Sequence, residues 1–320
     1  MIRVGIIGGA GYTAGELLRI LVNHPEARIV FVHSQSNAGN SVASVHEGLI
    51  GDTDLIFSDS YDLHAVDCLF MCSGHGASAE FWRKNERPED LRVIDLAQDF
   101  RDESEGYVYG LPEINRERIA ATNLVANPGC FATAIQLALL PLASAGLLAD
   151  DVEVTGVTGS TGAGVKPGAT THFSWRTDNL SVYKPFSHQH LAEIRRSLAS
   201  LMPGFSSRIN FIPVRGNFAR GIYVMAHTRC PLDEDALRKQ YEDFYAGARF
   251  TFVSDTPVDM KQAVNTNKAV ISVEKHGDRA LVLCAVDNLL KGASGQAVQN
   301  MNLMFGLPED AGLKLKPSGF

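Results

Sequence analysis

Short apolar runs alternate with helical stretches over the first 125 residues of the chain. The runs at 2–7 and 29–33 flank a segment in which leucines at 17, 18 and 21 follow helical spacing. Shorter runs at 69–72 and 93–96 each lead into a turn of small or polar residues. This alternation predicts an α/β unit with a doubly wound, parallel sheet, whose ligands are expected beyond the carboxyl ends of the strands.

The pattern changes after Asn127-Pro128-Gly129. The stretch 124–149 carries no charge, but its polar and helix-breaking residues indicate a buried helix from about Cys130 rather than a membrane span. The β-rich segments that follow predict a second, α+β domain with a larger, mostly antiparallel sheet. The last helical stretch, 295–307, is expected to pack on the first domain. The β-rich segments are 152–157, 210–212, 221–228, 269–274 and 281–286.

Composition and charge narrow the class of protein. A length of 320 residues suits about two domains, and 29 Lys and Arg against 36 Asp and Glu give a net charge of −7. Because the cations are scattered, the chain lacks the basic surface of a protein that binds nucleic acid or an anionic membrane. Five irregularly spaced cysteines suit neither a disulfide framework nor a zinc site. Glycines in 8–15 interrupt the apolar N-terminal run, unlike a signal peptide. We expect a cytoplasmic protein with small-molecule partners.

A glycine-rich turn, Gly8-Gly9-Ala10-Gly11-Tyr12-Thr13-Ala14-Gly15, joins the first predicted strand to the first predicted helix. Such a turn lets backbone and helix N-terminus approach a pyrophosphate, which predicts dinucleotide binding; a tight turn without a ligand is the alternative. The second strand ends in Ser34-Gln35-Ser36-Asn37, without the carboxylate that usually holds the ribose of NAD. Small hydroxyl groups suit a 2′-phosphate, so NADPH is the expected cofactor. The cofactor-binding candidates are Gly8, Gly9, Gly11, Tyr12, Thr13, Ser34 and Ser36.

Cys130 opens the uncharged helix. A thiol at the positive end of a helix dipole loses its proton more readily, which favours a thiolate nucleophile. From position alone, a buried and inert cysteine is equally compatible. The other cysteines lie in apolar or strand-like stretches and are expected in the core.

Two histidines and a glutamate, His188, His190 and Glu193, lie in a segment whose apolar residues follow helical spacing. The three-residue step puts Glu193 on the same face as His190, where a carboxylate can orient an imidazole that acts as acid or base. A solvated polar face is the alternative. A metal site needs a third ligand and none is suggested nearby, so no metal is expected.

The loop Gly159-Ser160-Thr161-Gly162-Ala163-Gly164 is suited to presenting backbone N–H groups to an anion. Several cations near such loops in the sequence are candidates to clamp carboxylate or phosphate oxygens, although each is also compatible with a solvated charge. These cations are Lys166, Arg176, Lys184, Arg215 and Arg220.

Five motifs extend over nearly the whole chain: Gly8 to Leu17, Val93-Ile94-Asp95-Leu96 with Asp99-Phe100-Arg101, Tyr109-Gly110-Leu111-Pro112-Glu113, Asn127-Pro128-Gly129-Cys130, and Asp287-Asn288-Leu289-Leu290-Lys291-Gly292 through Gln299-Asn300-Met301-Asn302. In this order they resemble the N-acyl-gamma-glutamyl-phosphate reductases, relatives of the aspartate-semialdehyde and glyceraldehyde-phosphate dehydrogenases. The cysteine motif and the last motif together are highly specific.

The resemblance implies a Rossmann-type NADP-binding domain at 1–129 and 293–320, a catalytic and dimerisation domain at 130–292, and a homo-oligomer, either dimer or tetramer. It also implies reduction of an acyl phosphate to a semialdehyde in arginine biosynthesis, with Cys130 as nucleophile, His190 as acid/base and Glu193 as its orienter. The remaining expected binding residues are Gly162 and Asn288 for NADPH, and Ser160, His188, Lys184, Arg215 and Arg220 for the substrate.

The sequence departs from the family's usual pattern at three places. Cys-Tyr-Pro-Thr is replaced by Cys130-Phe131-Ala132-Thr133, and His-Arg-His by His188-Gln189-His190. A segment that usually reads Pro-His-Leu-x-Pro-Met-x-Arg-Gly is Pro213-Val214-Arg215-Gly216-Asn217-Phe218-Ala219-Arg220-Gly221. The additional Arg215 suits a second carboxylate, as in an N-succinyl rather than an N-acetyl substrate. Solvent exposure, or pairing of Arg215 with an acidic neighbour, is the alternative.

Two other functions compete with this interpretation. An aspartate-semialdehyde dehydrogenase shares the cysteine chemistry but not the 287–302 motif. A non-catalytic NADP-binding sensor would not need Cys130, His190 and Glu193, and all three are present.

Overall fold

In the computed structural model, which describes residues 1–74 and 76–318, the chain forms two compact units. The first unit consists of Met1–Pro128 and Ala293–Lys314, and the second of Gly129–Gly292 and 315–318. The expected first domain included all of 293–320, whereas 315–318 belong to the second unit. Residues 319–320 lie outside the described residues.

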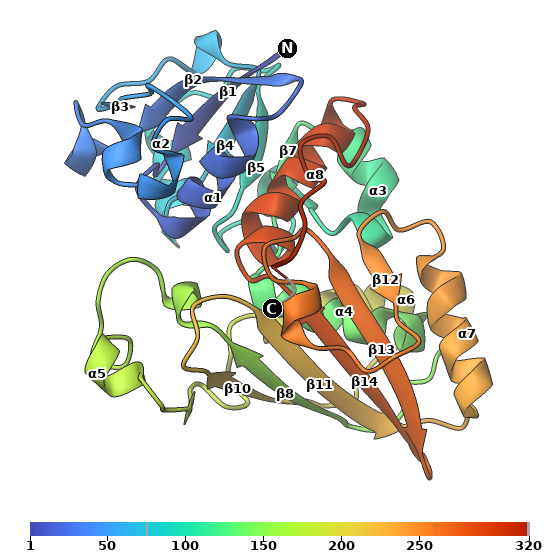
Figure 1. Ribbon diagram of the computed structural model, residues 1–320. Coiled ribbons are helices and arrows are strands. Elements are labelled where there is room, and N and C mark those ends of the chain that lie inside the picture. Colours follow the sequence, from blue (N-terminus) through green and yellow to red (C-terminus); the bar gives the residue numbers. More distant parts are fainter. Residues whose placement is uncertain (75, 319–320) are drawn as a thin grey trace. The chain divides into compact units, whose positions relative to one another are not determined.

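The first unit is built on a sheet with strand order β3-β2-β1-β4-β5-β7-β6, in which the pairs run parallel (Figure 1). β1 is an almost continuous buried run, as expected for a strand covered on both faces. Because β1 pairs with β2 on one side and with β4 on the other, the winding reverses there, which confirms the predicted doubly wound sheet. The strands are β1 Ile2–Ile7, β2 Ala27–His33, β3 Phe57–Ser58, β4 Cys68–Met71, β5 Arg92–Asp95, β6 Val108–Tyr109 and β7 Leu124–Ala126.

The last helix of the first unit returns from the C-terminal part of the chain, as predicted. The Asn302 Oδ1 atom lies 3.0 Å from His24 Nε2, and Asn300 Nδ2 donates to the Gly110 carbonyl at 2.9 Å and to Asn127 Oδ1 at 3.1 Å. These buried contacts fix α8 to the rest of the unit. The helices of this unit are α1 Tyr12–Leu21, α2 Ala77–Lys84, α3 Pro112–Ala120 and α8 Gly295–Met304.

The second unit is built on a mixed sheet with strand order β12-β13-β14-β11-β8-β10-β9. β8–β10 and β12–β13 are parallel, and the other pairs are antiparallel, so the predicted antiparallel character is confirmed for the centre of the sheet. The strands are β8 Val152–Thr158, β9 Ser181–Val182, β10 Ile209–Arg215, β11 Ile222–Arg229, β12 Thr251–Val253, β13 Ala269–His276 and β14 Arg279–Val286.

The predicted uncharged helix is α4, Cys130–Ser144, and it packs on this mixed sheet. The ring of Phe131 lies against Gly156 of β8, where an added Cβ would lie 2.5 Å from the nearest ring atom. Tyr241 and Tyr245 also hold α4 by donating to backbone carbonyls of the helix, each at 2.6 Å. None of the described helices is long and apolar enough to cross a membrane. The other helices of the unit are α5 Phe173–Arg176, α6 Leu191–Leu201 and α7 Glu234–Tyr245.

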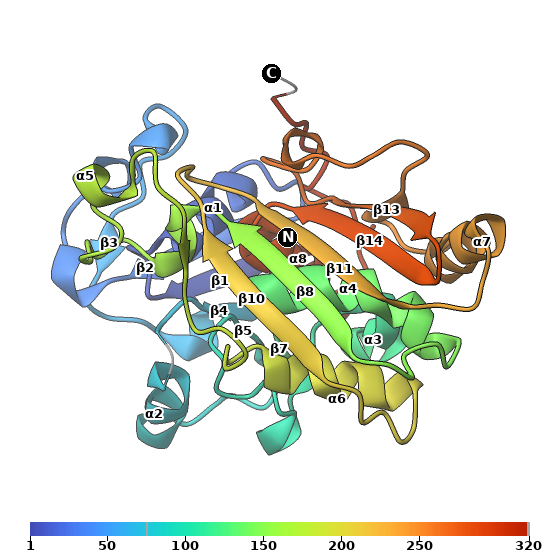
Figure 2. The same ribbon diagram turned by 90° about the horizontal axis from the view of Figure 1, so that it is seen from below.

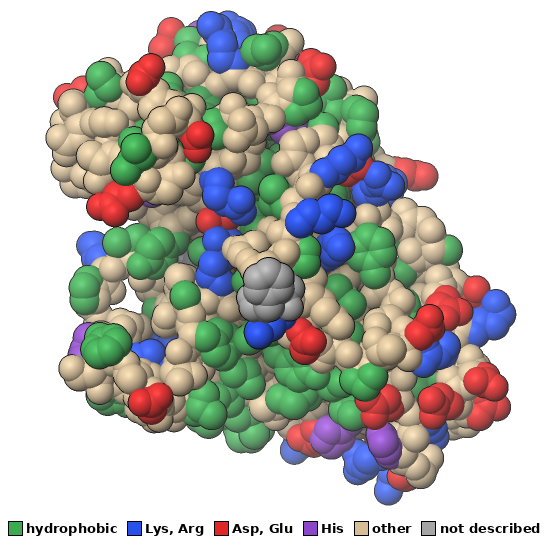
Figure 3. Space-filling view, viewed as in Figure 1, with side chains coloured by type: hydrophobic (Ala, Val, Ile, Leu, Met, Phe, Trp, Pro, Cys, Tyr) green, Lys and Arg blue, Asp and Glu red, His purple; other side chains and the backbone are tan. Residues whose placement is uncertain are grey.

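The sheet has a second face, opposite α4. Because side chains alternate along a strand, residues one position from Gly156 point away from α4. The strand register aligns Ile212, Thr155, Met225, Leu283 and Ser272 in one row across β10, β8, β11, β14 and β13. Figure 2 looks onto this face, with β8, β11 and β14 in front of α4, and Figure 3 shows hydrophobic side chains gathered over these strands.

Candidate functional site

The glycine turn between β1 and α1 is closely packed at Gly8 and Gly9 and open at Gly11. Gly8 has φ +82°, and a Cβ there would lie 2.8 Å from the backbone of Cys72, so a side chain has no room. Gly9 N–H donates to the His33 carbonyl at 2.9 Å, which ties the turn to the end of β2. Nothing lies within 4 Å of a Cβ placed at Gly11, directly before α1. The turn therefore leaves open space at a helix N-terminus, which fits a pyrophosphate.

His46 supports this turn and was not predicted. Its Nε2 atom lies 2.7 Å from the Gly9 carbonyl oxygen, and its Nδ1 atom lies 2.6 Å from where a Cβ of Gly15 would be. Gly15 is therefore needed to let His46 approach α1. Ser294 Oγ fixes the first turn of α1 by donating to the Thr13 carbonyl at 2.7 Å. Both residues are distant from the turn in sequence, so spacing within the motif gave no indication of them.

The two predicted serines lie at the end of β2, as the sequence indicated. Ser34 is buried, and Asn37 Nδ2 lies 3.4 Å from its Oγ atom and 3.2 Å from that of Ser36. Ser36 is exposed. The carboxyl end of β2 therefore presents hydroxyl and amide groups.

Cys130 is the first residue of α4, and two close contacts position it. Gly129, the N-cap residue, donates its N–H to Glu193 Oε2 at 3.1 Å. A Cβ on Gly292 would lie 2.9 Å from the Cβ of Cys130, so only glycine fits at position 292 beside this cysteine. The role of Gly292 was not predicted, although the residue ends one of the motifs quoted above. Cys130 is partly buried and lies at a helix N-terminus, as a reactive thiolate requires.

His190 and Glu193 are brought together, and Glu193 reaches the start of α4, but the helix that carries Glu193 begins later than the sequence indicated. α6 starts at Leu191, so His188 and His190 precede it, and His190 is its N-cap residue. His190 Nε2 lies 4.0 Å from Glu193 Oε1, and both residues are 6 % exposed. Glu193 thus faces His190 with one oxygen and holds the start of α4 with the other.

His188 lies in an aromatic cluster next to His190. Its ring centroid is 4.6 Å from that of His190, and rings of Phe131, Tyr183 and Phe211 surround it. Its Nδ1 atom accepts the His190 N–H at 3.2 Å. Burial lowers the pKa of His188 to about 4, and the charge of Lys184 contributes to this shift. His188 is therefore neutral near pH 7 and orients His190 as a hydrogen-bond acceptor.

The glycine-rich loop after β8 is attached to a distant segment of the chain. The N–H groups of Ser160 and Thr161 donate to the carbonyls of Phe218 and Ala219 at 2.8 and 3.1 Å, so these two groups are not presented to an anion. Gly162 and Asn288, predicted together for cofactor binding, are neighbours, because a Cβ on Gly162 would lie 4.0 Å from Asn288 Nδ2. The Asn288 side chain also binds the loops by accepting from Gly221 N–H at 2.8 Å and donating to Thr161 Oγ1 at 3.0 Å.

The predicted cations differ in their surroundings. Arg220 forms a two-point ion pair with the fully buried Asp287, with both N–O distances 3.1 Å, so its charge is compensated within the chain. Lys184 is exposed and donates to Gln189 Oε1 at 3.1 Å. Arg215 and the buried Arg176 lie together at the end of β10. Lys166 is exposed.

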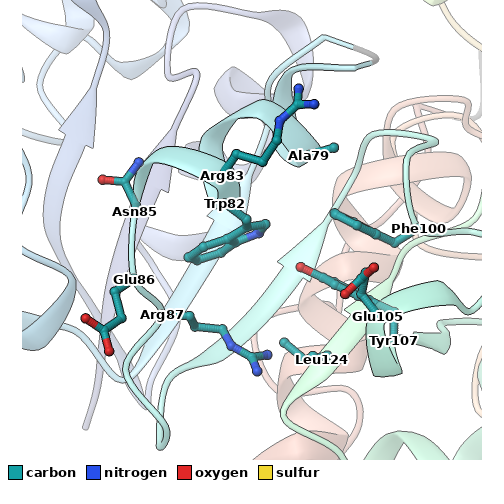
Figure 4. A pocket seen from close by; sticks show the side chains of 10 residues that line it. All are labelled: Ala79, Trp82, Arg83, Asn85, Glu86, Arg87, Phe100, Glu105, Tyr107 and Leu124. Carbon is teal, nitrogen blue, oxygen red and sulfur yellow. The ribbon is translucent and has the colours of Figure 1, made fainter.

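A separate cavity lies inside the first unit (Figure 4). It has a volume of about 580 Å³, and Trp82, Arg87 and the stacked rings of Phe100 and Tyr107 contribute to its wall. The residues that line it come from α2 and the following segment, from 100–107 and from β7. None of the predicted cofactor residues is among these lining residues of the described chain.

Comparison with known proteins decides the family. The semialdehyde dehydrogenase NAD-binding domain matches residues 3–122, and the semialdehyde dehydrogenase dimerisation domain matches residues 130–288. The N-acetyl-gamma-glutamyl-phosphate reductase of Phocaeicola vulgatus is 56 % identical over 322 residues, covering 100 % of both chains. A reductase of the same name from Christiangramia forsetii is 53 % identical, also over 100 % of both chains. The chain belongs to the N-acetyl-gamma-glutamyl-phosphate reductase family.

Solved structures agree on the fold of this reductase family member. Aspartate semialdehyde dehydrogenase II of Vibrio cholerae superposes with a TM-score of 0.76 at 19 % identity, covering 96 % of this chain and 98 % of that chain. A probable aspartate-semialdehyde dehydrogenase of Pseudomonas aeruginosa has a TM-score of 0.72 at 18 % identity, over 95 % and 98 % of the two chains.

Membership settles the class of chemistry. The chain is an oxidoreductase of the semialdehyde dehydrogenase type with a domain for a nicotinamide cofactor. The glycine turn lies within the matched cofactor domain, and Cys130 is the first residue of the matched dimerisation domain.

Proposed function

We propose that this protein catalyses the NADPH-dependent reduction of an N-acyl-gamma-glutamyl phosphate to the N-acyl-glutamate 5-semialdehyde and phosphate, a step of arginine biosynthesis. Full-length identity of 56 % with reductases of this kind carries the proposal. The Cys130, His190 and Glu193 group supports it, because an acyl-phosphate reductase needs a nucleophile and a nearby acid/base.

The chain's own residues account for the covalent steps. The Cys130 thiolate attacks the acyl carbon, the carbon–oxygen bond to phosphate breaks, and phosphate leaves a thioester on the sulfur. NADPH, when bound, supplies the hydride that reduces this thioester to a hemithioacetal. The carbon–sulfur bond then breaks, which releases the aldehyde and regenerates the thiolate. N–H groups in the first turn of α4 are placed to stabilise negative charge on the acyl oxygen.

His190 is the group that moves protons in this scheme. It donates a proton to the oxygen of the developing hemithioacetal and recovers it as the aldehyde forms. Glu193 acts as a positioning residue, since it faces the imidazole and also fixes the Gly129 N–H beside Cys130. The neutral His188 keeps the His190 backbone in place through its Nδ1 atom.

The preference for NADPH over NADH rests on the end of β2. Ser34, Ser36 and Asn37 present hydroxyl and amide groups there, and no carboxylate occurs in 34–37 to repel a 2′-phosphate. Gly8, Gly9, Gly11, Tyr12 and Thr13 would hold the pyrophosphate at the start of α1, and Gly162 and Asn288 remain proposed cofactor contacts.

The protein is proposed to act as a homo-oligomer. The matched dimerisation domain supports association, and the sheet face centred on Met225 offers an apolar surface for it. Ile212 and Met225 are partly exposed on the face opposite α4, where a second copy could cover them. Because a two-fold interface uses the same patch on both copies, one such sheet face on each copy suits a dimer.

One assay in the reverse direction tests the proposal. NADP⁺ reduction is followed with N-acyl-glutamate semialdehydes or aspartate semialdehyde, each with phosphate, and then with NAD⁺ in place of NADP⁺. We expect turnover with the glutamate compounds and a higher kcat/KM with NADP⁺. Activity on aspartate semialdehyde alone would favour the aspartate enzyme, and cofactor binding without turnover of any substrate would favour a sensor.

A further inference from the structure

Arg215 ends β10 with its charge uncompensated. Its guanidinium carbon lies 4.5 Å from the ring centroid of Tyr183, and its Nε atom is buried without a hydrogen-bond acceptor. Among the described residues no carboxylate oxygen lies within 4.0 Å of its nitrogens, in contrast to Arg220, which is paired with Asp287. The alternative that Arg215 pairs with an acidic neighbour is therefore wrong for the part of the chain that is described.

A continuous series of aromatic contacts joins Arg215 to the catalytic group. The Tyr183 ring beneath the guanidinium lies 5.8 Å from the ring of His188, which lies 4.6 Å from that of His190. Burial raises the pKa of Tyr183, and the nearby Cys130 adds to this effect, so Tyr183 is close to the nucleophile as well. All of these residues belong to the second unit, so the aromatic series and Cys130 lie within one unit.

Arg176 fixes the position of Arg215. Its guanidinium group donates hydrogen bonds to the backbone carbonyls of Arg215 at 2.7 Å and Thr170 at 2.9 Å. The Arg215 charge lowers the pKa of Arg176, after burial the second cause of that shift, so the two cations lie close together. Two neighbouring guanidinium groups that lack a carboxylate repel each other, and an anion bound to Arg215 would relieve this repulsion.

We propose that Arg215 binds a carboxylate at the far end of the substrate's acyl group, so that the preferred substrate carries a dicarboxylic acyl group of the succinyl type. This inference rests on the proposed function. Arg220, the other arginine of this segment, is neutralised by Asp287, whereas the charge of Arg215 is left for an anion of the substrate. A carboxylate at the end of the acyl group supplies such an anion, and the planar fork of Arg can bind it at two points.

The test compares kcat/KM for the N-succinyl- and N-acetyl-glutamate semialdehydes in wild type and Arg215→Ala. A charge-assisted contact favours the succinyl compound in the wild type by about ten- to a hundredfold, and Arg215→Ala should abolish most of that preference. Arg208→Ala is the matched control, because Arg208 lies just before the other end of β10 and is exposed. It should keep the wild-type preference.

Two further measurements test whether the preference depends on the charges of Arg215 and of the substrate's terminal carboxylate. Arg215→Lys should keep part of the succinyl preference. An N-succinamoyl semialdehyde, which replaces the terminal carboxylate by an amide, should be used by the wild type about as poorly as the N-acetyl compound. This second comparison needs no variant and so does not depend on how Arg215→Ala folds.

Several results would overturn the inference. They are a wild-type preference for N-acetyl, equal losses on both substrates in Arg215→Ala, and equal use of the succinyl and succinamoyl compounds. Equal losses would place Arg215 on a group that both substrates share, and the proposed function would still stand. No turnover of any glutamate semialdehyde would contradict the proposed function itself.

Discussion

At the scale of single residues, His188 and His190 differ although they are in contact. His188 is enclosed by aromatic rings and stays neutral, whereas His190 faces the carboxylate of Glu193. The sequence placed both histidines near Glu193 but gave no sign of which was enclosed. The aromatic neighbours Phe131, Tyr183 and Phe211 come from separate segments, so only the fold reveals the difference.

The acid/base assignment predicts a change in the pH–rate profile. His190→Asn should lower kcat by about a hundredfold or more and remove one limb of the profile, because general acid–base catalysis contributes about that factor. Glu193→Gln should lose less, since an amide oxygen can still accept the Gly129 N–H. NADPH affinity, measured by fluorescence titration, should change little in both variants. Near-normal turnover in His190→Asn would exclude the residue from the mechanism.

The burial of His188 predicts a pH-dependent stability. Its pKa is about 4 in the folded chain against an ordinary value of 6.5, so between these values the unfolded chain binds more protons and stability falls as the pH drops. At pH 5 this costs about 2 kcal/mol relative to pH 7.5. Urea unfolding of His188→Gln should show a smaller fall than wild type, by roughly that amount. His276→Gln, at an exposed histidine, should retain the wild-type fall; an unchanged fall in His188→Gln would contradict the assignment.

At the scale of elements, the hydrophobic pattern predicted the longer strands and the starts of α1 and α4. Hydrophobic runs that were long enough to show a strand or helix periodicity predicted β1, β8, β11 and α4. β3, β6 and β9 contain only two residues each, too short for any pattern, and exist because a neighbouring strand offers free backbone groups. The start of α6 was placed too early, because the histidines before it continue the helical spacing without being part of the helix.

The start of α4 predicts a strict requirement for glycine at position 292. Gly292→Ala would push on Cys130, since the new Cβ would lie 2.9 Å from the cysteine Cβ, closer than carbon atoms pack. Turnover should fall by at least about tenfold while NADPH binding persists, because a displaced nucleophile loses its alignment. Gly247→Ala is the control, as nothing lies within 4 Å of its added Cβ. Equal turnover in both variants would show that Cys130 tolerates the contact.

At the scale of the whole molecule, the sequence predicted one unit for the cofactor and one for the chemistry and dimerisation, and the family models match a cofactor-binding domain and a dimerisation domain. What the sequence could not supply were contacts between distant segments. His46 on the glycine turn, Gly292 against Cys130 and Asp287 on Arg220 each join residues that are far apart in the chain. The sequence also gave no sign that the N–H groups of Ser160 and Thr161 donate to the distant segment at 218–219.

We predict that the protein self-associates through the face of the mixed sheet that lies opposite α4. Met225→Asp puts a charge in the central row of that face, which should dissociate the oligomer because a buried, unpaired carboxylate is costly. Sedimentation velocity should show a smaller species than wild type. Ile50→Asp, at an exposed apolar residue of the first unit, should sediment like wild type. An unchanged oligomer in Met225→Asp would show that association uses another surface.

The central claim is that Cys130 carries the acyl group during the reaction. The most direct measurement is intact-mass and peptide mass spectrometry of the enzyme mixed with the N-acyl-glutamyl phosphate in the absence of NADPH. A mass increase equal to the acyl group, located on the peptide that contains Cys130 and absent in Cys130→Ser, is the predicted result. An adduct on Cys68, Cys72, Cys230 or Cys284 instead, or full turnover by Cys130→Ser, would contradict the account.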